Sequence, residues 1–271
     1  MRELIDCHLH TEACGHASGT VAQMVSAAVF AGLTGIVMTE HLPLPADLDP
    51  GEYLSPKSGQ FASYAQEVRG MAARVKGVDV VLGAEADWLP WRMEDTEAQL
   101  LLAREAGVDI ILGSVHSLDG WVFDDPTDTS EWDHRNVDEV WVQYFERWCD
   151  AARSGHFDVM AHPDLPKKFG HKPSFDTREL YAGAAQAAAD AGVLIEVSTA
   201  GLRKPVGELY PGPELLAAFR QAGVEITVGS DAHEPGDVGR DILAAYDAAA
   251  SAGYERVAFP LRRGEVRWIE L

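Results

Sequence analysis

Seven of the ten histidines in this 271-residue chain stand at or just beyond the ends of short apolar runs, with carboxylates beside them. The side chains in this setting are His8, His10, His16, His41, Glu85, His116, His162, Asp231 and His233. Imidazole nitrogens and carboxylate oxygens together suit Zn, Mn and Fe(II). The mixture therefore predicts a hydrolytic centre with several metals rather than a structural zinc site.

The other three histidines, His134, His156 and His171, lie in predicted loops or beside a helix end, and we expect them to be solvated. Any one histidine taken alone could equally be an ordinary core or surface residue. For the seven histidines at strand ends we reject this interpretation, because it would require all seven to occur beside carboxylates at strand ends by coincidence. The three cysteines show no CxxC spacing and are expected to be small, buried or half-buried thiols in a reducing compartment.

Composition narrows the class of protein further. Hydrophobic residues make up 46% of the chain, which is enough for one barrel-sized domain over residues 1–271. No apolar run reaches the roughly 18 residues of a membrane span, so we expect a cytoplasmic protein without a membrane partner. The formal net charge of −21 repels phosphate backbones and makes nucleic acid an unsuitable partner. The oligomeric state stays open.

Strand-like runs alternate with alanine-rich helical stretches along the whole chain, which predicts parallel strands joined by crossover helices. The seven expected strand and helix pairs are 3–10 with 21–32, 35–41 with 61–75, 78–88 with 95–107, 109–121 with 137–155, 157–165 with 177–192, 193–201 with 212–223, and 225–235 with 237–253. In a parallel barrel the carboxyl ends of all strands open on one face, so these motifs should converge there. The long loops 43–59, 119–136 and 167–178 are expected to cover that face.

The ordered motifs resemble those of the PHP (polymerase and histidinol phosphatase) superfamily, from about residue 5 to about residue 240. The histidinol-phosphatase branch is the most similar. Its likeness rests on Cys14-Gly15-His16-Ala17, Thr39-Glu40-His41, the segment 113–121 (GSVHSLDGW), Lys167-Lys168-Phe169-Gly170 and the segment 200–205 (AGLRKP). The resemblance implies a distorted (β/α)7 TIM-like barrel with three divalent transition metals, Zn, Mn or Fe, at the carboxyl ends of the strands.

Three ligand sets follow from the resemblance. One metal would be held by His8, His10, Glu85 and Asp231, a second by Glu85, His116 and His162, and a third by His16, His41 and His233. The division agrees with strand geometry, because alternate residues of a strand point the same way, as do His8 and His10. A carboxylate such as Glu85 can also bridge two cations with its two oxygens, which an imidazole cannot do.

The related amidohydrolase barrels also begin with an HxH motif and are the nearest alternative. They typically bridge their metals with a lysine and end on a lone aspartate. Here no lysine stands at a strand end before Lys167, Glu85 occupies the bridging position, and the last strand carries Asp231-x-His233. The phosphoesterase family fits the chain better.

Fixed positive charge is needed to bind phosphate, and basic pairs follow two of the predicted strands. They are Lys167 with Lys168, and Arg203 with Lys204. The resemblance assigns phosphate contacts to Lys168 and Arg203, and the planar fork of Arg203 suits the transition state. The alternative for each is an ordinary solvated loop cation.

Further contacts to substrate are predicted for two residues near the end of the fourth predicted strand. They are Ser117, next to His116, and Trp121, for which core packing is the alternative. A water held on a metal, Asp119 or Asp164 is a candidate proton donor to the leaving group. Asp164 could instead orient the nearby ligand His162 or cap the following turn, and the turn is the preferred alternative.

The expected function is that of a metal-dependent phosphomonoesterase, in which metals supply hydroxide for attack on phosphorus. The resemblance points to L-histidinol phosphate, a small phosphate monoester of histidine biosynthesis, as the substrate. Two alternatives remain from the sequence. One is hydrolysis of another small phosphate, such as a nucleotide, a sugar phosphate or phosphotyrosine. The other is a metal-binding PHP barrel without catalytic activity.

Overall fold

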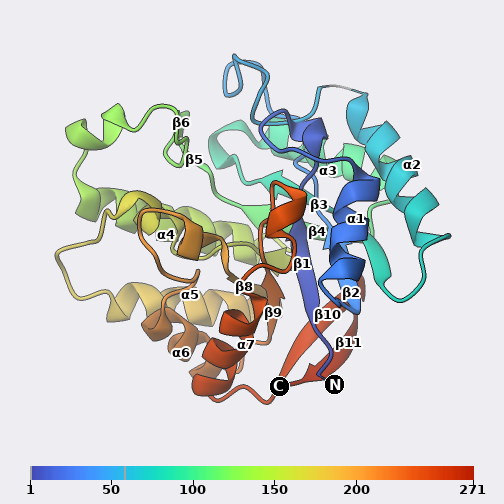
Figure 1. The fold of residues 1–271 in the computed structure, drawn as a ribbon. Coiled ribbons are helices and arrows are strands. Elements are labelled where there is room, and N and C mark those ends of the chain that lie inside the picture. Colours follow the sequence, from blue (N-terminus) through green and yellow to red (C-terminus); the bar gives the residue numbers. More distant parts are fainter. Residues whose placement is uncertain (1, 58) are drawn as a thin grey trace.

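The computed structural model describes residues 2–57 and 59–271, and its centre is a seven-stranded parallel sheet curled almost into a barrel (Figure 1). The strands follow the order β1-β2-β3-β4-β7-β8-β9. Their bounds are β1 Ile5–Leu9, β2 Gly35–Met38, β3 Asp79–Asp87, β4 Ile110–Ser114, β7 Val159–Met160, β8 Leu194–Ser198 and β9 Ile226–Gly229. The first and last strands meet at their carboxyl ends, where the His10 amide donates to the Ala232 carbonyl (2.9 Å). The predicted α/β barrel is confirmed.

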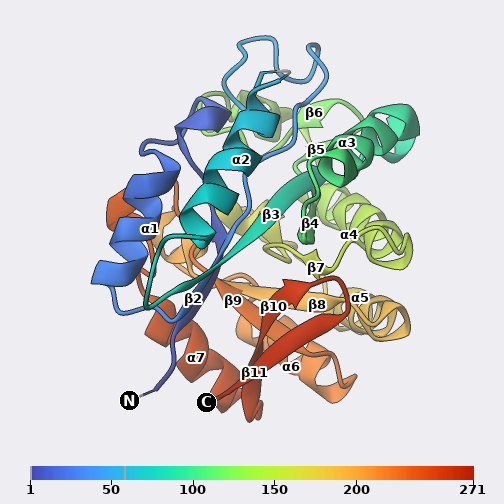
Figure 2. The same ribbon diagram turned by 90° about the vertical axis from the view of Figure 1, so that its right-hand side faces the viewer.

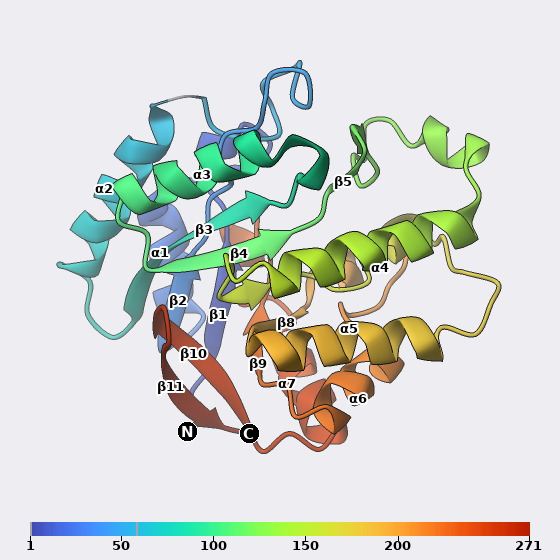
Figure 3. The ribbon, with the colours of Figure 1, turned by 180° about the vertical axis from the view of Figure 1, so that it is seen from behind.

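Helices cover the outside of the sheet, one after each barrel strand (Figures 2 and 3). They are α1 Val21–Phe30, α2 Gln60–Ala72, α3 Met93–Glu105, α4 Val137–Arg153, α5 Arg178–Ala191, α6 Pro213–Gln221 and α7 Ile242–Ser251. Every residue of β2 is buried, because helices cover the sheet on the outside and packed side chains fill the barrel on the inside. A strand buried on both faces is an unbroken apolar run in the sequence. The first helix begins with a capping box in which Thr20 and Gln23 satisfy each other's backbone amides.

Two small hairpins add to the barrel. Strands β5 (Ser117–Leu118) and β6 (Trp121–Val122) form one in the loop after β4. Strands β10 (Arg256–Arg262) and β11 (Glu265–Glu270) form the other, beside both chain ends in Figure 1. The second hairpin packs on the barrel through Phe259, whose ring lies against Gly35, where a Cβ would come within 2.6 Å of it. Neither hairpin was expected from the sequence.

The helix boundaries agree with the expected ranges except at α7. This helix begins at Ile242 and not near residue 237, because Pro235–Asp237 forms a separate short 3-10 turn first. Among the described residues, no helix combines the length and the apolar character needed to cross a bilayer.

Candidate metal centre

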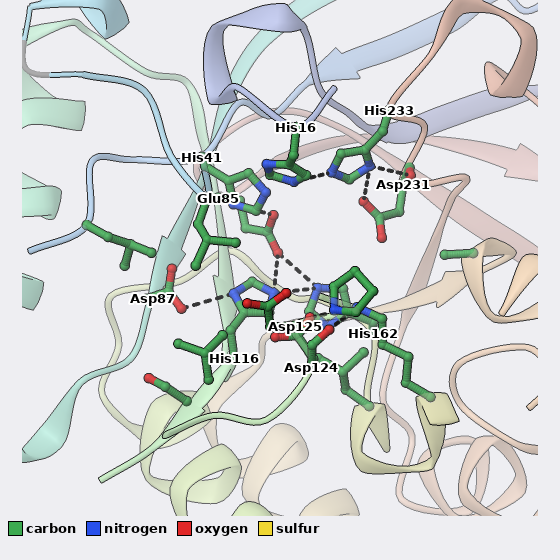
Figure 4. A pocket seen from close by; sticks show the side chains of 18 of the residues that line it. His16, His41, Glu85, Asp87, His116, Asp124, Asp125, His162, Asp231 and His233 are labelled. Carbon is green, nitrogen blue, oxygen red and sulfur yellow. Dashed lines mark hydrogen bonds and ion pairs between the residues drawn. The ribbon is translucent and has the colours of Figure 1, made fainter. Parts of the chain in front are cut away.

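The nine predicted ligand side chains converge at the carboxyl ends of the barrel strands. His8 and Glu85 lie within β1 and β3, and the other seven follow β1, β2, β4, β7 and β9 directly or within a short loop. Figure 4 shows His16, His41, Glu85, His116, His162, Asp231 and His233 around one cavity. His8 and His10 are completely buried at its base. Segments more than 220 residues apart in the sequence therefore supply one site, as with His8 and Asp231, whose Nε2 and Oδ1 atoms are 3.7 Å apart.

Glu85 lies at the middle of the cluster, and its two oxygens face different imidazoles. Oε2 is 3.2 Å from His8 Nε2 and 3.3 Å from His10 Nε2. Oε1 is 2.9 Å from His162 Nε2 and 3.4 Å from His116 Nε2. This two-sided arrangement is the one that a carboxylate bridging two cations requires.

The buried histidines at the base are surrounded by negative charge. Burial opposes protonation of His8, but Glu196, Glu85 and Asp231 outweigh it and raise the pKa of His8 well above its usual value. The pKa of His10 is raised in the same way, against its burial, by nearby carboxylates. Neither ring nitrogen of His10 makes a hydrogen bond among the described residues. A cation bound here would give these buried nitrogens a partner and would balance the charge of the nearby carboxylates.

His16 and His233 give a second test of whether a metal fits. Nδ1 of His16 donates to the Tyr53 carbonyl (2.8 Å), and Nδ1 of His233 donates to the Asp231 carbonyl (3.0 Å). Burial lowers the pKa of both rings, so both are neutral and carry lone pairs on Nε2. These two Nε2 atoms face each other at 2.9 Å, as the dashed line in Figure 4 marks. Opposed lone pairs repel unless a cation lies between them, so the donor set fits a metal ion.

The side chains gather into groups that match the predicted sets only in part. Glu85, His116 and His162 form one group, and His8, His10 and Glu85 form another. Asp231 approaches the second group, with Oδ1 3.3 Å from His10 Nε2. The third predicted set is divided, because His233 is grouped with His10 and His41 on one side and with His16 and Cys14 on the other.

Two carboxylates that the sequence analysis did not single out accept hydrogen bonds from Nδ1 atoms of these histidines. His116 Nδ1 donates to Asp87 Oδ1 (2.9 Å), and His8 Nδ1 donates to Glu196 Oε1 (2.9 Å). Such contacts fix the orientation of a ligating ring and leave its other nitrogen directed at the metal. Asp87 could have been found, since it lies two residues after Glu85 on the same face of β3. The apolar surroundings of Glu196 in the sequence gave no comparable signal.

The cavity above the cluster has a volume of about 290 Å³. Two residues predicted to bind substrate, Ser117 and Lys168, line it, and so do Asp124, Asp125 and Lys204. The Lys168 ammonium lies 2.9 Å from Asp124 Oδ2. Although burial acts against it, this lysine keeps the pKa of Asp124 below its usual value. The cavity wall thus carries both ammonium and carboxylate groups.

Arg203 is placed elsewhere. Its guanidinium lies 3.1 Å from Asp237 Oδ2 and donates to the carbonyls of Ser230 (2.6 Å) and Thr199 (3.4 Å). It is not among the described residues that line the cavity, whereas its neighbour Lys204 is. The contact of Arg203 with phosphate stays a prediction, and Lys204, which follows the turn over Ala200–Arg203, is the member of this basic pair that lines the cavity.

Three other predicted contacts also lie off the cavity wall. Trp121 packs at ring distances of 5.0 Å from Trp132 and 6.1 Å from Phe123, in agreement with the packing alternative. Asp119 bonds with Gln143 and Arg147 at the surface. Asp164 is buried, where it pairs with Lys167 (2.9 Å) and accepts from the Gly212 amide. Oδ1 of Asp164 has no hydrogen-bond partner among the described residues, and burial raises the pKa of this carboxyl to about 6. The role of Asp119 or Asp164 in protonating a leaving group stays a prediction.

Comparison with known proteins gives the family. The model of the PHP domain family matches residues 6–200. A protein of Deinococcus radiodurans named "Probable histidinol-phosphatase" is 38% identical over 97% of this chain and 99% of its own length. The histidinol-phosphatase of Bacillus subtilis is 26% identical over 86% of this chain and 95% of its own length.

A solved structure has the same fold. It is the histidinol phosphate phosphatase of Lactococcus lactis in complex with zinc, L-histidinol and phosphate. It superposes with a TM-score of 0.81 at 20% identity and covers 98% of this chain and 99% of its own. With a family model matching well over half of its length and a relative at 38% identity, the chain belongs to the PHP domain family.

Proposed function

We propose that this protein is a metal-dependent phosphomonoesterase that hydrolyses L-histidinol phosphate to L-histidinol and phosphate. The observation that carries the proposal is the position of Glu85 beside a cavity with lysines on its wall. Its Oε2 faces His8, His10 and His41, and its Oε1 faces His116 and His162. Membership of the PHP family and the similarity to histidinol-phosphatases along nearly the whole chain support the same activity.

The residues proposed to hold metals are His8, His10, His16, His41, Glu85, His116, His162, Asp231 and His233. We infer three divalent ions, with zinc as the first candidate and Mn or Fe as alternatives, because the donors are imidazoles and carboxylates. When bound, such ions activate water for attack on phosphorus and neutralise the charge that develops on the phosphoryl oxygens.

Lys204 and Lys168 are proposed to bind the phosphoryl group. Among the described residues Lys204 has no ion-pair partner, so its ammonium is available to a phosphate oxygen. The pKa of Lys204 is lowered, first by its partial burial and then by the nearby Lys168 charge, which an incoming dianion would relieve. Lys168 pairs with Asp124 and would contribute a second ammonium group to the binding of the phosphoryl group. Positioning and electrostatics of this kind account for most of the catalysis of phosphoryl transfer.

The carboxylates of the cavity wall favour a substrate that carries positive charge beside its phosphate. Asp124 and Asp125 lie opposite His16 and His233 across the opening in Figure 4. An amine or an imidazolium, both present in L-histidinol phosphate, would find a favourable potential there. A nucleotide or a sugar phosphate lacks such a cation, and its hydroxyl groups would gain less from this wall.

We further infer that residues 1–271 form one PHP-type barrel domain and that the protein acts in the cytoplasm in histidine biosynthesis. All three cysteines are free thiols, as expected for a reducing compartment.

The test is a phosphate-release assay on metal-reconstituted protein with a panel of monoesters. We expect kcat/KM for L-histidinol phosphate to exceed that for a nucleoside monophosphate, a sugar phosphate and phosphotyrosine by about 10²-fold or more, because a site loses affinity for the transition state when a substrate leaves its polar groups unpaired. A higher value for another member of the panel would assign the protein to a different substrate. No hydrolysis of any member would favour a barrel without catalytic activity.

A further inference from the structure

Glu196, a buried residue of β8, contacts two proposed metal ligands at once. Its Oε1 accepts a hydrogen bond from His8 Nδ1 (2.9 Å), and its Oε2 accepts one from the backbone amide of His162 (2.7 Å). The carboxylate is 1% exposed. His8 and His162 face different oxygens of Glu85, with Nε2 atoms near its Oε2 and Oε1 respectively, and their rings stack with centroids 5.7 Å apart. Glu196 thus contacts one histidine beside each oxygen of Glu85.

The contact with His162 stabilises an unusual backbone. His162 has φ of +25°, in the region that residues with a Cβ rarely adopt. A residue held there is strained and persists only where its surroundings fix it. The strong hydrogen bond from its amide to a buried carboxylate provides such fixation. The backbone held in this way directs the ring of His162 toward Glu85, with Nε2 2.9 Å from Oε1.

A glycine on the neighbouring strand leaves room for the Glu196 carboxylate. A Cβ on Gly229 of β9 would lie 2.2 Å from Glu196 Oε1 and 2.7 Å from the His8 Cβ. Any larger residue at position 229 would therefore displace the carboxylate or the ligand that it holds. Among the described residues, His8 is the only ion-pair partner of Glu196. The buried negative charge is consequently left for cations of the cluster to balance.

We propose that Glu196 is a positioning residue that fixes the distance between the two metal positions on either side of Glu85. This inference rests on the metal-dependent function proposed above. In contrast to Asp87, which holds only His116, Glu196 holds one ligand of each position. Its loss should weaken two metals together and leave unchanged the one held by His16 and His233.

The experiment is a zinc titration against a chromophoric chelator on the full-length protein, which requires no substrate. In Glu196→Gln the amide NH₂ must face either His8 Nδ1 or the His162 amide, both donors, so one of the two contacts is lost, and the negative charge that lies beside both ligands is removed as well. We expect the affinity for two zinc ions per chain to fall 10- to 100-fold, the usual effect of removing a group that orients a ligand. Asp87→Asn is the matched control and should weaken one ion. Wild-type affinity in Glu196→Gln, or weakening of a single ion, would overturn the proposal.

Two further measurements separate positioning from other roles. The metal-free Glu196→Gln protein also loses a contact with His8 or His162, so its thermal midpoint should fall slightly, while the increase in the midpoint on adding zinc should be much smaller than in wild type. An equal loss with and without zinc would mean a structural role. Glu196→Asp keeps the charge but shortens the side chain, so it should not restore affinity, and full restoration would overturn positioning. If the protein hydrolyses no phosphate monoester, these zinc affinities still decide the role of Glu196.

Discussion

Glu85→Ala is expected to remove two metals per chain and to lower turnover of L-histidinol phosphate by at least about 10³-fold, the upper end of the cost of losing one fixed charge-stabilising group. The reason is the position of the carboxylate, with one oxygen near His8 and His10 and the other near His116 and His162. Without it, the imidazoles of His8, His10, His41, His116 and His162 would lose the carboxylate that lies among them. Elemental analysis of the purified variant beside steady-state kinetics measures both effects.

His16→Ala is the control for this variant. His16 lies at the rim, paired with His233 through their Nε2 atoms at 2.9 Å, and does not contact Glu85. We expect it to lose one metal at most and to retain more activity than Glu85→Ala. Full metal loading in Glu85→Ala would show that Glu85 does not bridge.

Lys204→Ala is expected to lower kcat/KM for L-histidinol phosphate by about 10²-fold with metal content unchanged, as the loss of a comparable charge-stabilising donor does. Lys204 lines the cavity, and its charge has no carboxylate partner among the described residues. Lys172→Ala is the matched control, because Lys172 is a loop lysine that pairs with Glu208 outside the cavity. We measure kcat/KM and metal content for both variants. The loss of kcat/KM should occur in Lys204→Ala, whose lysine lines the cavity, and not in Lys172→Ala.

The same series tests whether Arg203 or Lys204 contacts the phosphoryl group. Removal of its guanidinium breaks the contact with Asp237 and the bond to the Ser230 carbonyl, next to Asp231. Arg203→Ala should therefore affect stability and metal retention more than substrate binding. A larger loss of kcat/KM in Arg203→Ala than in Lys204→Ala, at full metal content, would return the phosphate contact to Arg203.

The barrel could be predicted from sequence because its strands are buried on both faces and stand out as apolar runs between alanine-rich helices. The convergence of the nine side chains followed from the same pattern, since parallel strands end on one face. The β10–β11 hairpin was missed because it lies beyond about residue 240, outside the motifs that guided the interpretation. The late start of α7 was missed because the 3-10 turn over Pro235–Asp237 resembles a helix start in sequence.

The residues around the cluster were harder to predict, for a physical reason. Arg203 and Lys204 are adjacent in a turn, and only its backbone conformation decides which of them reaches the cavity. Asp119 and Asp124 both follow β4 in the sequence, yet only Asp124 is directed toward His116 and Lys168. Glu196 acts through contacts with residues 188 and 34 positions away, which no local pattern records.

The most direct test of the account is to return zinc to chelator-treated protein while metal content and phosphate release from L-histidinol phosphate are measured together. The nine side chains predict that two to three zinc ions bind per chain. Turnover should be absent at zero occupancy and should rise as the positions on either side of Glu85 fill. Undiminished hydrolysis by the metal-free protein, or less than one zinc per chain after reconstitution, would contradict the proposed metal-dependent phosphatase.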